Sequence, residues 1–460
     1  MYKVFYQPEN TWMGDIMPYG KEGKFFLYHQ RDPRDPGPLT LSVPFGWSLS
    51  TTEDFLNYKD FGDVIPNGGD NDIDQFIYAG NVFEAKGKVH AFYTGFNREW
   101  EKEGKVSQVL LHGESEDFIH WKKNVGELKL PPQAGYDFGD WRDPKVIWNQ
   151  EKKEYLLILG ARLEGPKTKM SGRLVSFTSK NLENWEFNGD FYTPNIYTMI
   201  EMPDLFKMGD WWYLVYTEYS DESKTRYRMS KNIDGPWIKP KDDAFDGRAY
   251  YAARTAFDGK RRVLFGWVPT KEKNDDMNNF EWGGTFVPEE IVQRRDGTLG
   301  VKLPETLINA FEEKKTIGDE VIHNEEGLSE KILFKNVGNH FLFNTKVLFE
   351  EVSGFSIRLF KNQETDESYE FLISVDNQHV VFDKSPNFPW YQVMNKGLQR
   401  PVKLECGKEH DIKVVCDDDI LVILVDDVCL TARVYNKFGN DLAVTATNGS
   451  AIFKDINLRK

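Results

Sequence analysis

The sequence predicts an all-β protein in which an N-terminal five-bladed β-propeller is followed by a C-terminal β-sandwich. Two repeated patterns and one change of pattern support this prediction. Short aromatic and aliphatic runs, each preceded by a charged or glycine-containing turn, begin about 51 to 65 residues apart, at Phe25, Val89, Glu154, Trp211 and Arg262. Such runs after tight turns are typical of β-hairpins.

A second series follows four of these runs by roughly 20 to 27 residues, beginning at Ser50, Ser115, Ser179 and Ser230. Each member has a Ser, then an Asp or Asn, then an aromatic residue about six positions on. The repeating unit of about 50 to 65 residues is long enough for four short strands, and five units predict a five-bladed propeller over residues 1–304. We expect the aromatic residue that ends each member to pack between blades.

The pattern changes after Pro304. Residues 305–316 form a predicted linker, and its first part, ETLINAFEEKK, is the best helix candidate because its apolar residues fall on roughly one face. From residue 317 to residue 460 strand-like runs alternate with turns again. This last segment is predicted to be an antiparallel β-sandwich without a cluster of residues that demands chemistry.

Composition excludes several classes of protein. The 460 residues include 58 Lys and Arg against 73 Asp and Glu, a net charge of −15, which argues against nucleic acid or an anionic membrane as the main partner. The three cysteines, Cys406, Cys416 and Cys429, have neither a disulfide framework nor metal-ligand spacing. The first residues lack the pattern of a signal peptide. We therefore expect a cytoplasmic monomer or homodimer that needs no metal or organic cofactor.

Three acidic residues share one position in the predicted propeller. The innermost strands of all blades surround one central funnel, so residues on them can converge although they are distant in sequence. Asp15 precedes the hairpin of the first unit, and Asp143 and Glu201 lie on the inner strands of the third and fourth units. Glu201 stands in an apolar run, where a carboxylate either faces a cleft or is an expensive buried charge.

Glycosidic cleavage needs such carboxylates. One attacks or stabilises the anomeric carbon, and another, protonated, delivers a proton to the leaving oxygen. The acid must keep its proton near neutral pH, which an apolar pocket and a nearby negative charge both favour. Glu201 fits the acid, and Asp15 fits the nucleophile. Asp143, beside Arg142, fits an ionised carboxylate that holds sugar hydroxyls and stabilises an oxocarbenium-like transition state.

Four short blocks then show a family resemblance. WMGDIMPY resembles a W-M-N-D-P-N-G block, FFLYHQRDP an L-F-Y-Q-Y-N-P block, WRDP an R-D-P block and IEMPDLF an E-C-P-D-L-F block. In this order they resemble glycoside hydrolase family 32, the invertase, levanase and inulinase group, over nearly the whole chain. The resemblance implies a propeller followed by a sandwich, with Asp15 as nucleophile, Asp143 as transition-state stabiliser and Glu201 as acid/base.

The resemblance and the aromatic content also give candidate substrate-binding residues. These are Trp12, Gln30, Trp47, Tyr78, Asn81, Arg142, Tyr251 and Trp282. Trp282 is expected either as a sugar platform or as a packing residue. The opening block departs from the family pattern, because Gly14 stands where the family has Asn, and this predicts a reshaped sugar subsite.

The predicted activity is retaining hydrolysis of a terminal β-fructofuranosyl linkage in a fructosyl disaccharide or a short fructan. Three alternatives stay open from the sequence. One is a fructosyltransferase that uses the same site. Another is a family 43-type arabinosidase or xylosidase. The third is a catalytically inactive carbohydrate-binding protein.

Overall fold

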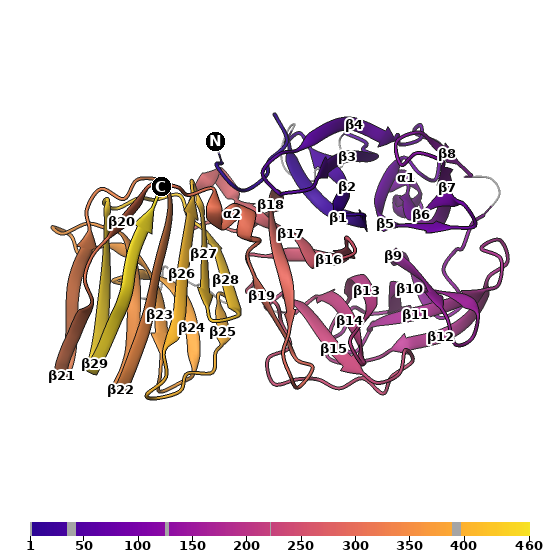
Figure 1. The fold of residues 1–460 in the computed structure, drawn as a ribbon. Coiled ribbons are helices and arrows are strands. Elements are labelled where there is room, and N and C mark those ends of the chain that lie inside the picture. Colours follow the sequence, from indigo (N-terminus) through magenta and orange to yellow (C-terminus); the bar gives the residue numbers. More distant parts are fainter. Residues whose placement is uncertain (1, 35–42, 125–127, 221, 389–396) are drawn as a thin grey trace.

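The computed structural model describes residues 2–34, 43–124, 128–220, 222–388 and 397–460. Two β-rich bodies lie side by side, a ring of small sheets and a stack of long strands (Figure 1). The ring is formed by the first two thirds of the chain and the stack by the last third. This arrangement confirms the predicted all-β fold of a propeller followed by a sandwich.

The ring consists of five antiparallel blades. Blades 1 to 3 have four strands each: β1 (Trp12–Lys21), β2 (Lys24–Asp32), β3 (Trp47–Thr52) and β4 (Lys59–Ile65); β5 (Phe76–Ala85), β6 (Lys88–Phe96), β7 (Gln108–Ser115) and β8 (Trp121–Lys123); β9 (Tyr136–Asn149), β10 (Glu154–Leu163), β11 (Gly172–Ser179) and β12 (Glu186–Tyr192). Blade 4 has β13 (Ile200–Met208), β14 (Trp211–Glu218) and β15 (Thr225–Ser230), and blade 5 has β16 (Tyr251–Phe257), β17 (Arg262–Lys271), β18 (Phe280–Gln293) and β19 (Leu299–Lys302). β18 also pairs with β1 between Met13 and Gly284, which closes the ring.

Blade 4 departs from the expected four strands. Within the described residues its sheet contains three strands, and two isolated bridges, Met229 with Ile238 and Arg226 with Ala244, stand where a fourth strand would pair. The segment between these bridges contains the Gly235–Pro236 pair. Proline lacks the backbone N–H that a strand ladder needs, so the chain here follows its blade without forming a ladder.

The second repeated series is a turn with a physical basis. Asp54, Asp117 and Asn181 each accept hydrogen bonds from the backbone N–H groups two and three residues further along, at 2.8–3.1 Å. The residue after each has a positive φ, 64° at Phe55, 70° at Phe118 and 67° at Leu182. An Asp or Asn side chain that caps its own turn in this way explains why the sequence repeats there.

The aromatic residues that end this series do pack between blades. Tyr58 contacts Phe286 of blade 5, Trp121 contacts Tyr28 of blade 1, Trp185 contacts Phe92 of blade 2 and Trp237 contacts Phe191 of blade 3, with ring centroids 5.4–6.5 Å apart. Each ring therefore lies at the seam with a neighbouring blade, as predicted.

In the part of the sandwich that the structure describes there are ten strands: β20 (Lys314–Thr316), β21 (Glu320–Phe334), β22 (His340–Lys361), β23 (Ser368–Ser374), β24 (His379–Ser385), β25 (Gln399–Pro401), β26 (His410–Asp417), β27 (Ile420–Val425), β28 (Val428–Arg433) and β29 (Asp441–Arg459). The first half of β22 pairs with β26, and the second half pairs with β23. The register of β22 against β29 shifts between Phe349 and Val352. The long strands thus pass from one layer to the other, and a single apolar core lies between the layers.

The segment between the two bodies differs from the expected helical linker. The helix α2 (Glu305–Asn309) is only five residues long, and Lys314–Thr316 already forms β20, which pairs with β29. Besides α2, the described residues contain the helix α1 (Arg98–Lys102) and the short η1 (Glu272–Asn274). In the described part of the chain no helix is long and apolar enough to cross a membrane.

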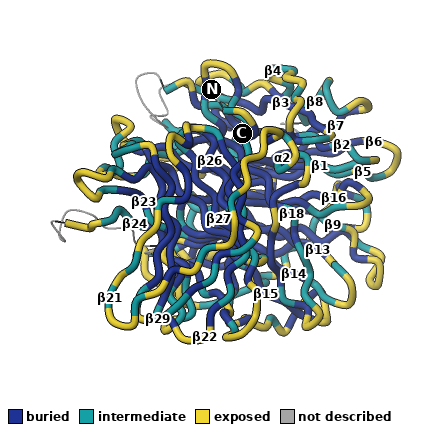
Figure 2. Tube along the Cα trace, turned by 60° about the vertical axis from the view of Figure 1, so that its left-hand side comes forward, coloured by how far each residue is buried: buried dark blue, intermediate teal, exposed yellow. Residues whose placement is uncertain are grey.

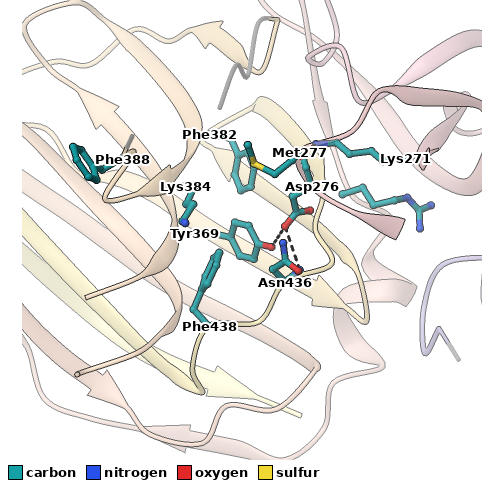
Figure 3. Close-up of a pocket in the computed structure, with 10 residues that line it drawn as sticks. Lys271, Asp276, Met277, Tyr369, Phe382, Lys384, Phe388, Asn436 and Phe438 are labelled. Atoms are coloured by element: carbon teal, nitrogen blue, oxygen red, sulfur yellow. Dashed lines mark hydrogen bonds between the residues drawn. The ribbon is translucent and has the colours of Figure 1, made fainter. Parts of the chain in front are cut away.

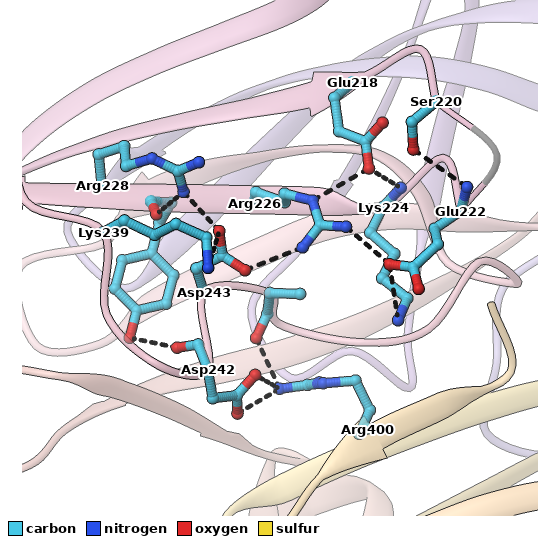
Figure 4. Close-up of polar contacts among 12 residues, drawn as sticks. Glu218, Ser220, Glu222, Lys224, Arg226, Arg228, Lys239, Asp242, Asp243 and Arg400 are labelled. Carbon is cyan, nitrogen blue, oxygen red and sulfur yellow. Dashed lines mark hydrogen bonds and ion pairs between the residues drawn. The ribbon is translucent and has the colours of Figure 1, made fainter. Parts of the chain in front are cut away.

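The two bodies share a polar interface. Arg433 of β28, 3% exposed, donates to the carbonyls of Val268 and Pro269 in β17, both at 2.9 Å. Arg400 of β25 pairs with Asp242 at 2.8 Å and donates to the carbonyl of Ala244 (Figure 4). Arg226 and Arg228 of β15 both bind Asp243 beside this contact. Most strands are buried and the exposed residues gather at the turns (Figure 2), so this interface is part of the buried interior.

Candidate active site

The inner strand of every blade is interrupted by the same irregularity. In β1, β5, β9, β13 and β16, two consecutive residues stand opposite a single residue of the next strand, which is a β-bulge. Counting one flanking residue on each side, the bulges define five hub segments, residues 13–16, 77–80, 142–145, 201–204 and 251–254. The three predicted catalytic carboxylates, Asp15, Asp143 and Glu201, all lie in these segments.

The bulges hold the backbone in an uncommon conformation. The first bulged residue has a positive φ in three blades, 65° at Asp143, 50° at Met202 and 55° at Ala252. Bulges bend a strand and redirect its side chains, and they recur beside active sites. Here they allow side chains of neighbouring positions to meet at the centre of the ring instead of alternating between the two faces of a blade.

Glu201 has the most contacts among the three carboxylates. It is 8% exposed. The hydroxyl of Tyr219 donates to its Oε2 at 2.9 Å, and the hydroxyl of Tyr251 donates to its Oε1. Nη2 of Arg142 lies 3.4 Å from Oε2. Since a tyrosine hydroxyl both donates and accepts, the two tyrosines can serve the ionised and the protonated carboxyl alike.

Asp143 is fixed on both sides of its backbone. It is 2% exposed, and its Oδ2 accepts a hydrogen bond of 3.0 Å from the backbone N–H of Met202, next to Glu201. Its own N–H donates to Oγ1 of Thr94 at 2.9 Å. Arg142 pairs with Asp140 at 2.8 Å and brings its Nε to 3.9 Å from Asp143. These contacts join blades 2, 3 and 4 around one carboxylate.

Asp15 has few donors. Nε1 of Trp267 donates to its Oδ1 at 3.2 Å. Burial raises the pKa of Asp15 well above its usual value, and the charges of Glu201 and Asp143 add to this rise. Burial also raises the pKa of Glu201, which Arg142 opposes and Asp143 reinforces. Asp15 and Glu201 therefore titrate as a coupled pair that keeps a proton at a higher pH than separate carboxyls would.

Four predicted binding residues lie partly exposed near the carboxylates: Trp12, Tyr78, Tyr251 and Trp282. Trp282 contacts Trp267, the partner of Asp15, with ring centroids 5.8 Å apart. Phe45 stacks near both Trp282 and Tyr78, at 6.3 and 6.1 Å. The aromatic rings thus form a continuous wall beside Asp15, which is the kind of surface that the C–H faces of a sugar pack against.

Two predicted binding residues are placed elsewhere. Trp47 is fully buried, and its indole N–H donates to the carbonyl of Tyr78 at 3.0 Å, so the ring belongs to the core between blades 1 and 2. Asn81 joins blade 2 to blade 3, because its Oδ1 accepts from the N–H of Val146 at 2.8 Å. In both residues these polar atoms bind neighbours within the fold, and their contact with a sugar stays a prediction.

Gln30 occupies an intermediate position. It stands opposite the bulge that carries Asp15, is 1% exposed, and donates from Nε2 to the carbonyl of Ile77 at 3.1 Å. Among the described residues its Oε1 has no hydrogen-bond partner. Gln30 therefore links blade 1 to blade 2 and retains one free acceptor next to Asp15.

The sequence reasoning missed several residues of the site. Tyr219 follows β14, Trp267 lies in β17, and Arg254 lies in the last hub segment. Arg34 places its guanidinium 4.8 Å from the ring of Trp12 and binds Glu281 at 2.7 Å. Arg254 could have been found by its register, since it follows the bulge of blade 5 as Lys145 follows that of blade 3. Tyr219 lies beside Glu201 in the β13–β14 hairpin. Trp267 reaches Asp15, and Arg34 reaches Glu281, through ring closure, which leaves no local signal.

Other cavities and ligand-like groups lie outside the hub. A cavity of about 200 Å³ between the blade 5 loop and the sandwich is lined by aromatic rings, among them Tyr369, Phe382 and Phe438 (Figure 3). Two groups of three potential metal ligands occur in the described residues, one built on His90 and His112 and the other on Glu289 and Cys429. Neither the cavity nor the two groups includes a hub carboxylate.

A ring of five blades with three clustered carboxylates and an aromatic wall, followed by a sandwich, defines a glycoside hydrolase. Comparison with known families refines this class. Residues 5–299 match the family described as "Glycosyl hydrolases family 32 N-terminal domain". The chain belongs to glycosyl hydrolase family 32, as the sequence blocks predicted.

Individual relatives agree with this assignment. The chain is 22% identical to the "Levanbiose-producing levanase" of Bacillus subtilis (strain 168), over 96% of this chain and 86% of that protein. It is 22% identical to the "Sucrose-6-phosphate hydrolase" of Escherichia coli, over 97% and 92%. Among solved structures, fructan 1-exohydrolase IIa from Cichorium intybus matches with a TM-score of 0.80 at 14% identity, covering 100% of this chain and 97% of that one.

Proposed function

We propose that the protein is a retaining glycoside hydrolase that cleaves the terminal β-fructofuranosyl linkage of a fructosyl disaccharide or a short fructan. The observation that carries the proposal is the cluster of Asp15, Asp143 and Glu201 on the inner strands of three blades. The names of the relatives support the substrate class, because they describe levanases, sucrose-6-phosphate hydrolases and β-fructofuranosidases.

In the proposed first step, Asp15 attacks the anomeric carbon of the fructosyl unit while Glu201 donates its proton to the departing glycosidic oxygen. The bond from that carbon to the leaving oxygen breaks, and a bond to Asp15 forms. In the second step Glu201, now ionised, takes a proton from water, whose oxygen displaces Asp15 and releases fructose. Two inversions give net retention of configuration.

Asp143 and Arg142 have a supporting role in this proposal. The transition state carries positive charge on the sugar ring, so a fixed carboxylate beside it is stabilising. Backbone contacts on Asp143 keep its carboxylate in place before substrate arrives, which avoids reorganisation during the reaction. Arg142, bound to Asp140, provides N–H donors for sugar hydroxyls.

The test is a panel of fructosides assayed with the purified protein and four variants. Asp15→Asn and Glu201→Gln keep side-chain size, and we expect them to fold and to lose about 10²-fold or more in kcat/KM. Glu84→Gln, which removes an exposed carboxylate that pairs with Lys21, is the control for the loss of one negative charge. The double variant Asp15→Asn/Glu201→Gln should have a kcat/KM within a few-fold of that of the less active single variant, because the two groups act as one unit.

Product analysis separates the competing activities. NMR of freshly released fructose should show the anomer of the substrate, whereas an inverting arabinosidase-like mechanism would release the opposite anomer from an arabinoside. Longer oligosaccharides at high substrate concentration would identify a transferase. Binding in calorimetry without turnover of any fructoside would identify a binding protein and would overturn the proposal.

The remaining predictions from the sequence are proposed with it. We propose a catalytic propeller at residues 1–304 and a sandwich domain at 317–460, joined by residues 305–316, of which Lys314–Thr316 pair with β29; limited proteolysis would test these bounds. A cytoplasmic location is tested by cell fractionation. Light scattering distinguishes a monomer from a homodimer.

A further inference from the structure

Arg254 crosses the centre of the propeller. It is the last residue of the blade 5 hub segment and is 1% exposed. Its guanidinium reaches two other blades: Nη1 donates to the carbonyl of Gly80 in blade 2, and Nη2 donates to the carbonyl of Asp143 in blade 3 at 2.6 Å. Nη1 also lies 3.3 Å from the carbonyl of Pro144. One side chain thus connects three hub segments.

The partners of Arg254 are unusual for a buried arginine. All of them are backbone carbonyls, its Nε has no partner, and within the described residues no carboxylate forms an ion pair with it. A buried guanidinium is costly unless it is compensated. Here its compensation comes from carbonyl dipoles and from carboxylates at longer range, so its positive charge acts on the surrounding hub rather than on one partner.

We propose that Arg254 is the positioning residue of the active site: it fixes the bulge that carries Asp143 and supplies a positive charge that favours the ionised form of Asp15. The proposal rests on the proposed glycosidase function, since it assigns Arg254 to the same reaction.

The first part of the proposal follows from the backbone of Asp143. This residue has a φ of 65°, a conformation that non-glycine residues adopt only when their surroundings hold them there. Thr94 binds its N–H and Arg254 binds its carbonyl, so the two peptide groups that flank its Cα are both fixed. The direction of the carboxylate is set by these two contacts together with the bond from Met202.

The second part follows from charge. The carboxylates that interact with Arg254 are Asp15, Asp143 and Asp204. Asp143 has the largest of these interactions, and Asp204, the next, is also paired with Lys145 at 2.7 Å. Asp15 is also faced by Glu201 and Asp143, which oppose its ionisation, and by the hydroxyls of Tyr78 and Tyr251. Arg254 is the cation that lowers the pKa of Asp15 against these effects.

The blade 5 strand offers a matched control. Nη1 of Arg262 donates to Oγ1 of Thr255 at 2.8 Å. The carboxylate that acts on it is Asp204, not Asp15 or Asp143. Arg262→Lys therefore perturbs a neighbouring, partly exposed arginine without changing the charge next to the proposed nucleophile.

The experiment compares Arg254→Lys, Arg254→Gln and Arg262→Lys with the wild-type enzyme. For Arg254→Gln we expect a loss in kcat about 10²-fold or greater, with KM changed only a few-fold, because Asp143 and Asp15 act mainly in the transition state. The acid limb of the kcat/KM profile should move to higher pH by about one unit, since removing a nearby positive charge disfavours the carboxylate. Arg254→Lys keeps the positive charge but cannot bind the carbonyls of Gly80 and Asp143 with two separate nitrogens. Its acid limb should therefore stay at the wild-type pH, while its kcat should still fall.

A readout without substrate distinguishes failure of this inference from failure of the proposed function. Trp267 donates to Asp15, so tryptophan fluorescence should change with pH as Asp15 titrates. The pH transition that disappears in Asp15→Asn is the one that belongs to Asp15. We expect its midpoint to rise in Arg254→Gln and to stay in place in Arg262→Lys. An unmoved midpoint together with an unmoved acid limb in folded Arg254→Gln overturns the inference. If Arg254→Gln does not fold, the inference is tested with Arg254→Lys alone. It is overturned if the acid limb of Arg254→Lys moves or if the kcat of Arg254→Lys equals that of the wild type.

Discussion

Gly14 is the position at which a single methyl group should disturb the site most. A Cβ built on Gly14 would lie 2.9 Å from Cζ3 of Trp282 and closer still to Cζ2 and Cη2 of the same ring, whereas ordinary contacts begin at 3.4 Å. The backbone of Gly14 is not in the left-handed region, so alanine is excluded by the indole alone. The ring therefore occupies the space into which any longer side chain at position 14 would extend.

The cost of Gly14→Ala can be worked from these contacts. The nearest ring atom must move by more than an ångström to reach ordinary contact, and the ring is confined by Trp267 and Phe45. Inserting a methyl group into such packing costs about 1–3 kcal/mol. Since about 1.4 kcal/mol corresponds to a factor of ten, and the displaced ring presses on the partner of Asp15, we expect kcat/KM to fall by about 10- to 100-fold.

The assay is a double-mutant cycle with Trp282→Leu, which removes all three atoms that the new methyl group would meet. Trp282→Leu alone should weaken activity through the loss of the aromatic wall. The double variant should be no worse than Trp282→Leu, because the clash no longer exists. Gly318→Ala is the control, since nothing lies within 4 Å of a Cβ there. A full penalty for Gly14→Ala in the Trp282→Leu background would refute the reasoning.

Three further predictions concern a titrating pair, an interface and a buried acid. Tyr219→Phe removes a donor that lowers the pKa of Glu201, so the basic limb of kcat should move to higher pH by about half a unit to one unit in a pH–rate profile. Arg433→Met removes the carbonyl contacts of β28 and leaves Asp419 without its buried cation, so urea unfolding should show a loss of about 2–5 kcal/mol. Burial raises the pKa of Glu289 well above its usual value, so the wild-type protein should lose stability as pH rises from the usual carboxyl range toward that raised value. Glu289→Gln removes this cost, and its advantage in thermal or urea unfolding should grow with pH to about 1–3 kcal/mol near neutrality; an advantage that does not change with pH would contradict this reasoning.

The sequence could reveal the propeller because each blade repeats a locally encoded element. The turn at Asp54, Asp117 and Asn181 is made by a side chain that bonds its own backbone, and the rings at Trp121 and Trp185 follow it at a fixed distance. Both signals lie within a few residues, so they survive in a single sequence. Blade 4 shows the limit, because its Gly-Pro segment replaces the fourth strand without altering the repeat spacing.

The site was predictable only along the inner strands. Asp15, Asp143 and Glu201 could be placed together because the blade repeat gives their register. Which side of a strand faces the hub could not be decided, because a bulge breaks the alternation of side chains; Asn81, which follows the bulge of blade 2, bonds blade 3. Tyr219 meets Glu201 within the blade 4 hairpin, 18 residues away, whereas Trp267 meets Asp15 across 252 residues, a contact that arises only when the ring closes.

The five hub segments also set the charge that the reaction meets. Their ionisable carboxyl and basic side chains are Asp15, Asp143, Glu201 and Asp204 against Arg142, Lys145 and Arg254. With all of these ionised the hub carries a charge of −1, and with one proton on Glu201 it is neutral. In the proposed mechanism a neutral sugar binds to this neutral hub. Transfer of the proton to the leaving group would then restore the negative charge as positive charge develops on the sugar, which would favour the transition state over the bound substrate. Removing Arg254 would shift this balance to −1 before the proton leaves, and the excess charge would favour a second proton on Asp15, the group that must be ionised to attack.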